Sequence, residues 1–385
     1  MVNKESIELF HDGIIALREN NYERAVTALT KAISLQDNVS NYHNNLGLAY
    51  LGQGKTEQAI KCFEKAVELD PQNSHPYYCF GVVFQKKGAI EASLVNYRKA
   101  FLLDSSYTDA LANIINILLC SGENDVALSS LEPSSSSEDD WRRLILTSNR
   151  MIIDWINRAC DFGVYEPVSL EENIRTKNYL MYFGYLTKLM DFYKQNRALF
   201  NDGKRHIPIY VFGDSHSLAF SNLIMGKCVG KTELIMGMKM WHFSSHDNHF
   251  FRACLKARLS KLPLHSHLLF TFGEIDCRPD EGIWIACQNG KGSLSELIFS
   301  TVTNYISWLK DHLASSVPAS LTIQGVPAPT YQNPGADFID MVKNVNSLLQ
   351  EQALNNGWRF LDVYDAPHID DHHILPSFYS ALHWA

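Results

Sequence analysis

The stretch LGLAYLGQGKTEQAIKCFEKAVELDP, residues 46–71, carries a spacing of small and large residues that recurs along the first third of the chain. Aligned in steps of 34 residues, the sequence matches itself from four starting points, which are Ser6, Ser40, Ser74 and Thr108. Three kinds of residue then share a phase in the first three units: Gly13, Gly47 and Gly81; Ala32, Ala66 and Ala100; Leu29, Phe63 and Tyr97. Because small residues let two helices approach and large ones fill the gap, the pattern predicts a solenoid of helical hairpins.

The second unit resembles the tetratricopeptide repeat. The residues that stand where its consensus places them are Leu46, Gly47, Tyr50, Ala59, Phe63, Ala66 and Pro71. Other units depart at single positions: Ser93 replaces an alanine in the third, Ile115 replaces a glycine in the fourth, and Pro71 has no counterpart elsewhere. The 34-residue period is still recognisable despite these changes, so we expect a repeat array of about three to four hairpins over residues 1–131.

A solenoid of this kind has a concave face, and such faces usually bind peptides or neighbouring proteins. The resemblance phases five residues toward that face: Asn41, Asn44, Leu48, His75 and Tyr78. The alternative is that the array only packs against the rest of its own chain.

The sequence EPSSSSEDD, residues 132–140, consists of turn-forming and acidic residues and predicts a linker. The following residues 141–204 show helical spacing and are expected to form a helical connecting region. Within it, residues 176–200 are rich in Tyr and Phe. A stripe of this kind most often marks the buried side of a helix, so a core face is favoured over a ligand site.

The last part of the chain alternates short apolar runs with helical stretches. The runs are residues 207–212, 268–272, 320–326 and 358–363. This alternation predicts a parallel sheet covered by helices on both faces. Polar clusters follow three of the runs, at residues 213–216, 273–276 and 370–373, and chemistry in such sheets collects at the carboxyl ends of the strands.

Two of these clusters resemble the SGNH/GDSL hydrolase family. The motifs are VFGDSHS, residues 211–217, and DDHHILP, residues 370–376. The resemblance covers residues 205–385 and implies a flavodoxin-like three-layer α/β/α domain. It makes Ser215 the nucleophile, His373 the general base and Asp370 the group that orients the imidazole.

The chemistry of these residue types agrees with the resemblance. A serine hydroxyl is a weak nucleophile until an imidazole takes its proton, and that imidazole needs a carboxylate to fix its tautomer. The alternative is that Ser215 only caps a helix, a role that serine fills well. The preceding strand and the terminal Asp-x-x-His favour the nucleophile.

The family pattern breaks at Ile275, where the resemblance calls for an asparagine that donates to the oxyanion. Isoleucine cannot donate a hydrogen bond, so Arg278 and the backbone amide of Gly237 are candidate replacements. Glu274, Asp276 and Arg278, with Asp214, are expected at the rim of the site. A structural ion pair that closes the loop is the alternative for these charged residues.

The function that follows is a serine esterase or O-acyltransferase acting on an acylated small molecule or a glycan, with the repeats docking a protein partner. Hydrolysis and transfer are not separated, because they differ only in whether water or an alcohol reaches the acyl-enzyme. The alternative function is a catalytically impaired SGNH-type fold that serves as a binding or scaffold protein. The resemblance implies no cofactor.

The composition of the chain narrows the classes of protein to which it can belong. The chain has 385 residues, of which 46% are hydrophobic, and a formal net charge of −8, which argues against a nucleic-acid-binding surface. No apolar run approaches the length of a membrane span, and the first residues lack the core of a signal peptide, so we expect a cytoplasmic protein. The eight cysteines form no Cys-x-x-Cys pair and are expected to be reduced.

The loop WHFSSHDNH, residues 241–249, contains residue types that ligate metals, namely His242, His246, Asp247 and His249. No helical or strand spacing brings them together. We therefore expect solvated or capping side chains and no metal.

Overall fold

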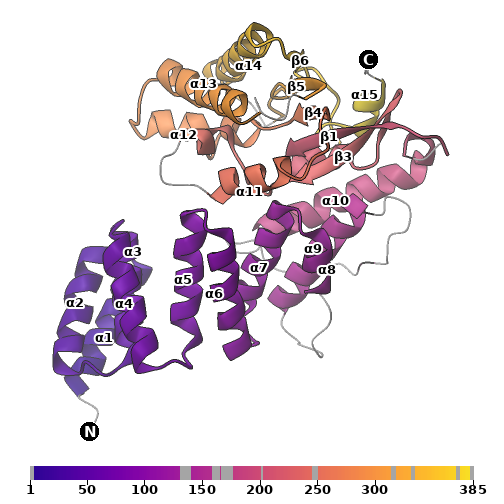
Figure 1. Cartoon of the computed structure of the whole chain (residues 1–385). Helices are drawn as coiled ribbons and strands as arrows, with labels where there is room; N and C mark the ends of the chain where they lie inside the picture. The colour runs from indigo at the N-terminus through magenta and orange to yellow at the C-terminus, as the bar shows by residue number, and fades with distance from the viewer. Residues whose placement is uncertain are drawn as a thin grey trace. The chain divides into compact units, whose positions relative to one another are not determined.

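The computed structural model describes residues 4–130, 140–157, 165, 177–200, 203–244, 250–313, 318–330, 334–369 and 373–381. The chain divides into two compact units, Met1–Ile117 (unit 1) and Leu118–Ala385 (unit 2) (Figure 1). The division falls inside helix α7, Thr108–Ser121. Of the predicted linker, residues 132–139 lie outside the described residues and Asp140 begins a helix.

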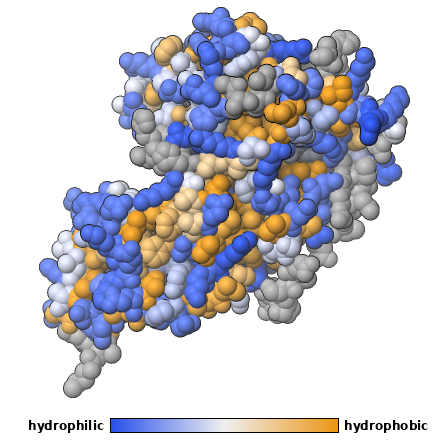
Figure 2. Space-filling view, in the orientation of Figure 1, coloured by the Kyte–Doolittle hydropathy of each residue, from blue (hydrophilic) through white to orange (hydrophobic). Residues whose placement is uncertain are grey.

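Unit 1 is a series of helical hairpins, each made of two consecutive helices packed against one another. The helices are α1 (Lys4–Arg18), α2 (Tyr22–Leu35), α3 (Ser40–Gly52), α4 (Thr56–Leu69), α5 (Ser74–Lys86) and α6 (Ile90–Leu103), followed by α7. Every first helix of a predicted unit begins within two residues of its predicted start. Apolar side chains remain visible between polar ones along this unit (Figure 2).

The glycines of the repeat are required by close contact with the large residues of the same unit. A Cβ atom at Gly47 would lie 2.4 Å from the ring of Phe63, and one at Gly81 would lie 2.5 Å from the ring of Tyr97. Ser93, which replaces the expected alanine, donates a buried hydrogen bond of 2.8 Å to the Gly81 carbonyl. The hydroxyl is thus accommodated by a partner, which explains why the departure leaves the hairpin intact.

Unit 2 contains a six-stranded sheet in the order β2-β3-β1-β4-β5-β6. Its strands are β1 (Ile207–Gly213), β2 (Ile224–Met225), β3 (Cys228–Leu234), β4 (His267–Phe270), β5 (Ser320–Gln324) and β6 (Arg359–Leu361). All pairs are parallel except β2 with β3, so the predicted parallel sheet has one antiparallel edge strand that was not predicted, and the sheet as a whole is mixed. Strand β3 was not predicted, because Lys231 and Glu233 interrupt its apolar pattern.

The described part of unit 2 also contains α-helices. They are α8 (Asn124–Ser129), α9 (Asp140–Asn157), α10 (Lys177–Gln195), α11 (Phe250–Leu259), α12 (Gly282–Gln288), α13 (Leu294–Leu313), α14 (Ala336–Asn355) and α15 (Pro376–Ala381). Helix α14 packs on β5 and β6, and α13 packs on α14 (Figure 1).

Helix α9 is anchored to the sheet region by specific hydrogen bonds. The buried Trp155 Nε1 donates to the Leu218 carbonyl at 2.7 Å, and Asn222 Nδ2 donates to the Ile156 carbonyl at 3.2 Å. The predicted connecting region therefore contributes to the same compact unit as the sheet. None of the described helices is long and apolar enough to cross a membrane.

Candidate active site

The central strand β1 ends at Gly213 and is followed by a short 3-10 helix, η2 (Ser215–Phe220). A Cβ atom at Gly213 would lie 2.0 Å from Thr271 Oγ1, so only glycine fits at this close approach. Asp214, not Ser215, caps the helix, since its carboxylate accepts the His216 backbone N–H at 3.0 Å. The capping alternative for Ser215 is thereby excluded, and its hydroxyl has another partner.

That partner is His373. Ser215 Oγ lies 2.8 Å from His373 Nε2, although the two residues are 158 positions apart. Both side chains are buried, with exposures of 2% for Ser215 and 1% for His373. The backbone of His373 is held by the Ile369 N–H, which donates to the His373 carbonyl at 2.8 Å. Asp370 lies outside the described residues.

The imidazole of His373 contacts two other rings. Tyr185, on α10, stacks on it with ring centroids 3.5 Å apart and an interplanar angle of 12°. His216 lies 4.8 Å away at a tilt of 33°. The tyrosine-rich segment, for which a core face was favoured, therefore supplies a residue to the site, and the stacking fixes the plane of the histidine ring.

Tyr182 lies one helical turn before Tyr185 on the same face of α10. It is buried, and Ser215 lies close enough for its side chain to affect the pKa of the Tyr182 phenol. Burial raises the pKa of the phenol well above its usual value, and the Asp214 carboxylate raises it further, while Arg278 and the bond with Ser215 act in the opposite direction. A phenol with its usual pKa of 10.0 is already protonated at neutral pH, and the upward shift keeps the Tyr182 hydroxyl in that form, in which it can donate a hydrogen bond.

A second histidine, missed by sequence reasoning, completes the centre of the site. His216 Nδ1 lies 2.9 Å from Asp214 Oδ1, and both side chains are 1% exposed. The other oxygen, Asp214 Oδ2, is buried and has no hydrogen-bond partner among the described residues. The only sequence signal for this pair was its spacing of two residues at the end of a strand.

Arg278 is engaged by carboxylates. Its Nε donates to both oxygens of Glu274, at 3.0 and 2.9 Å, and its Nη1 donates to Glu281 at 3.3 Å. Burial acts to lower the pKa of Arg278. The nearby carboxylates act more strongly in the opposite direction, so the pKa lies above its usual value; Glu274 has the largest effect of the three, followed by Asp214 and Glu281. The pair matches the structural alternative considered for this loop, and the guanidinium is a fixed positive charge near Asp214.

Asp276 also makes structural contacts. Its carboxylate accepts the backbone N–H groups of Met240 at 2.7 Å and Trp241 at 3.0 Å, at the start of the 3-10 helix η3 (Met240–Phe243). Burial raises the pKa of this carboxyl to about 7, although the two backbone bonds act to lower it. Asp276 thus fixes the loop after β3.

Gly237 lies in that loop, two residues after Ile235, whose N–H donates to the Gly213 carbonyl at 2.8 Å. This bond brings the loop to the carboxyl end of β1. The φ angle of Gly237 is 75°, in the left-handed region that favours glycine. Ile275, the departure from the family, is buried.

The histidine-rich loop is described only at its start. His242 Nδ1 accepts the Lys239 backbone N–H at 2.9 Å, and burial, with Lys239 and Arg252, lowers its pKa to about 3. His242 is therefore a neutral capping group. His246, Asp247 and His249 lie outside the described residues, and the described part of the chain contains no cluster of three or more His, Cys, Asp or Glu residues suited to a metal.

The candidate groove residues of unit 1 differ in accessibility. Asn41, Leu48 and His75 are exposed, and Tyr78 is half-buried. Asn44 is only 3% exposed, so its side chain is not available to a partner as predicted. It is buried because the α3 helix turns that residue toward the interior of the array.

Tyr78 is part of an aromatic cluster. Its ring stacks on Tyr107 at 4.8 Å and lies 5.4 Å from Tyr97, while His75 lies 5.4 Å from Tyr107. Asn113 donates to the Tyr78 hydroxyl at 3.3 Å. His75 and Tyr78 therefore have ring contacts within their own repeat, and Asn113 of the next repeat also holds Tyr78.

Comparison with known proteins identifies the first unit. A family model of the tetratricopeptide repeat matches residues 40–73, which form the hairpin α3–α4. The N-terminal region is thus a tetratricopeptide repeat array, and such domains typically bind protein partners. No curated protein matches the chain.

Several solved structures share a loose likeness. PilF of Pseudomonas aeruginosa is 14% identical, with 51% of this chain and 84% of that chain covered and a TM-score of 0.37. The MamA protein is 16% identical over 53% of this chain and 99% of its own, with a TM-score of 0.34. A Thermobaculum terrenum O-GlcNAc transferase mutant is 13% identical, covering 85% of this chain and 47% of that chain, at a TM-score of 0.31.

Proposed function

We propose that unit 2 is a serine esterase or O-acyltransferase of SGNH type in which Ser215 is the nucleophile and His373 the general base. The observation that carries the proposal is the buried 2.8 Å contact between Ser215 Oγ and His373 Nε2. A strand order in which the parallel strands run β3-β1-β4-β5-β6 supports it, because this is the 2-1-3-4-5 order of flavodoxin-like sheets.

The proposed reaction proceeds through an acyl-enzyme. Ser215 Oγ attacks the acyl carbon while its proton passes to His373 Nε2, and the same proton then goes to the departing alcohol. Water or an acceptor alcohol next attacks the acyl group, again with His373 as base. Asp370 is the group proposed to orient the imidazole, and the stacked Tyr185 ring restricts its rotation.

The negative charge that develops on the acyl oxygen must be stabilised by hydrogen-bond donors. We assign this role to the Ser215 and Gly237 backbone amides and to the Tyr182 hydroxyl, which would replace the asparagine that the family pattern has at Ile275. Support comes from the position of Tyr182 beside Ser215 on a helix that also carries Tyr185. Arg278, held by Glu274, would contribute a fixed positive charge rather than a direct contact.

The substrate of this site would be an acylated small molecule or glycan, and the repeat array would dock a protein partner. A binding or scaffold role for a catalytically inactive unit 2 is the second candidate. It is favoured by the buried isoleucine at position 275, where the family pattern has a donor.

Hydrolysis of p-nitrophenyl acetate tests the proposal. Ser215→Ala and His373→Ala should each lower kcat by about 10⁴-fold or more, since both act as one unit. Ser221→Ala is the matched control, because Ser221 is a buried serine at the end of the same 3-10 helix whose hydroxyl bonds Thr232 instead. If the wild type releases nitrophenol no faster than Ser215→Ala, the binding role is the better account.

A further inference from the structure

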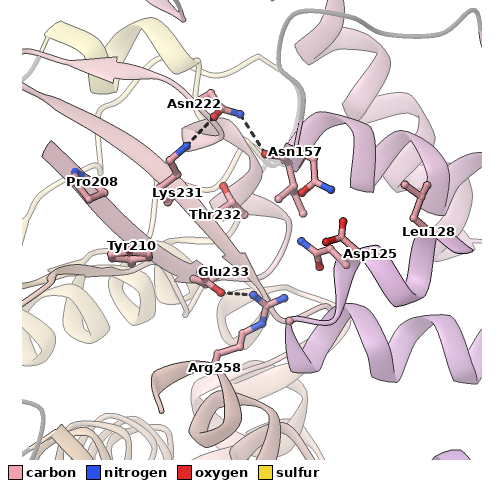
Figure 3. Close-up of a pocket in the computed structure, with 13 residues that line it drawn as sticks. Asp125, Leu128, Asn157, Pro208, Tyr210, Asn222, Lys231, Thr232, Glu233 and Arg258 are labelled. Carbon is pink, nitrogen blue, oxygen red and sulfur yellow. Dashed lines mark hydrogen bonds and ion pairs between the residues drawn. The ribbon is translucent and has the colours of Figure 1, made fainter. Parts of the chain in front are cut away.

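A polar pocket of about 750 Å³ lies in unit 2 against strands β1 and β3 (Figure 3). Helices α8, α9 and α11 complete its walls. It uses the first half of β1, at Pro208 and Tyr210, whereas Ser215 follows the carboxyl end of that strand. None of the candidate catalytic residues lines it, so it is separate from the site described above.

Four polar side chains of the lining have uncommitted hydrogen-bonding groups. Among the described residues, the side chains of Asn124, Asp125, Asn157 and Tyr210 have no hydrogen-bond partner. Asn124 Oδ1 is in addition buried, which makes its lack of a partner costly unless a ligand or water supplies one. Their polar atoms are thus available to a ligand in the pocket.

The other charged groups of the lining are balanced or occupied. Arg258 forms an ion pair with Glu233 and donates to two backbone carbonyls at the end of α7. Lys231 Nζ donates to Asn222 Oδ1 at 3.3 Å (Figure 3). With Lys231 and Arg258 opposite Asp125 and Glu233, the pocket carries no net charge, so it is not built for phosphate or another anion.

These features define the chemistry of a ligand. Asparagine side chains offer a donor and an acceptor in one plane, and a carboxylate accepts two hydrogen bonds, which matches neighbouring hydroxyl groups that both donate and accept. The ring of the half-buried Tyr210 offers an apolar surface to C–H groups between them. A volume of about 750 Å³ is within the range of small-ligand pockets.

We propose that this pocket is a binding site for a neutral carbohydrate. The proposal goes beyond the esterase function and does not depend on Ser215. The proposal concerns binding alone, with no chemical change to the sugar.

Saturation-transfer NMR on the full chain tests it. The probes are methyl α-glucoside, methyl β-galactoside, methyl α-mannoside and methyl N-acetyl-β-glucosaminide, with glucose 6-phosphate as the charged comparison. Ser215→Ala protein is used beside the wild type, so that loss of the proposed enzyme activity leaves the binding result unchanged. We expect at least one neutral glycoside to receive saturation in both proteins.

The double variant Asp125→Ala, Asn157→Ala removes two exposed side chains of the lining and should fold. It should weaken binding of that glycoside about tenfold or more, since several hydrogen bonds are lost. The matched control, Asp311→Ala with Asn344→Ala, changes exposed residues of α13 and α14 and should bind as wild type. Saturation of no neutral glycoside, binding of glucose 6-phosphate alone, or equal binding by the double variant would each overturn the proposal.

Discussion

The two units of this protein differ in how far apart in the sequence their decisive contacts lie. In unit 1, Gly47 meets Phe63 across one hairpin, and the same contact recurs as Gly81 with Tyr97. In unit 2, Ser215 meets His373 across 158 positions, and the tyrosines beside them come from a helix that precedes the sheet. Local contacts of the first kind join residues at a fixed separation, so a repeat period in the sequence predicts them. Contacts of the second kind form only once the whole sheet has folded.

In this comparison of the two units, the largest effect is expected in unit 2, from the loss of one oxygen atom that acts on the reaction and not on the fold. Tyr182→Phe keeps the buried ring and removes the hydroxyl beside Ser215. If that hydroxyl stabilises the oxyanion, kcat on p-nitrophenyl acetate should fall by about 100- to 1,000-fold with little change in KM.

Tyr179→Phe serves as control on the same helix, because the Tyr179 ring packs edge-on against Trp141. It should keep wild-type turnover. Equal rates for Tyr182→Phe and wild type, on an ester that wild type cleaves, would show that the hydroxyl has no part in the mechanism. The backbone amides of Ser215 and Gly237 would then be the donors that stabilise the oxyanion.

In unit 1, a comparable change should affect stability and not chemistry. Phe63 is fully buried and fills the space left by Gly47, so Phe63→Ala should destabilise the array by about 2–5 kcal/mol. Urea unfolding followed by circular dichroism measures this loss. Ester turnover by the folded variant should stay at the wild-type level, and a large drop would mean that the repeats form part of the active site.

A smaller effect should appear in the pH dependence of stability. The pKa of Asp276 is about 7 in the folded protein, raised by burial, so between about pH 4 and pH 7 the folded state holds a proton that the unfolded state has lost. The contribution of Asp276 to the free energy of unfolding therefore falls as pH rises through this window.

Asp276→Asn keeps an acceptor for the Met240 or Trp241 amide but does not titrate. Its decline in stability between pH 4 and pH 7 should be shallower than that of wild type by at least about 1 kcal/mol. Denaturant titrations at several pH values compare the two, and parallel curves would show that Asp276 is ionised throughout.

The contrast between the units also explains what the sequence could predict. The repeat period predicted the hairpins of unit 1 and their glycine contacts, but Asn44 was expected at the surface and is buried. In unit 2 the apolar runs predicted β1, β4, β5 and β6, with ends shifted by up to two residues.

Other parts of unit 2 depend on tertiary packing, and the apolar pattern of the sequence does not predict them. Strand β3 is half polar, and the antiparallel edge β2 has only two residues. The sequence spacing of Tyr182 and Tyr185 predicts only an ordinary apolar helix face, because Ser215 and His373, which lie near them in the fold, are distant in sequence. Motif resemblance could pair Ser215 with His373, but it contained nothing about the helix that covers them.

The central claim is that His373 activates Ser215, and a fluorophosphonate probe tests it most directly. Such a probe reacts with a serine only when a base has taken up its proton. Incubation of the full chain followed by peptide mass spectrometry should find a single phosphonylated serine, Ser215, and His373→Ala should abolish the label. An unlabelled Ser215 in folded wild-type protein, or equal labelling in the His373→Ala variant, would contradict the account.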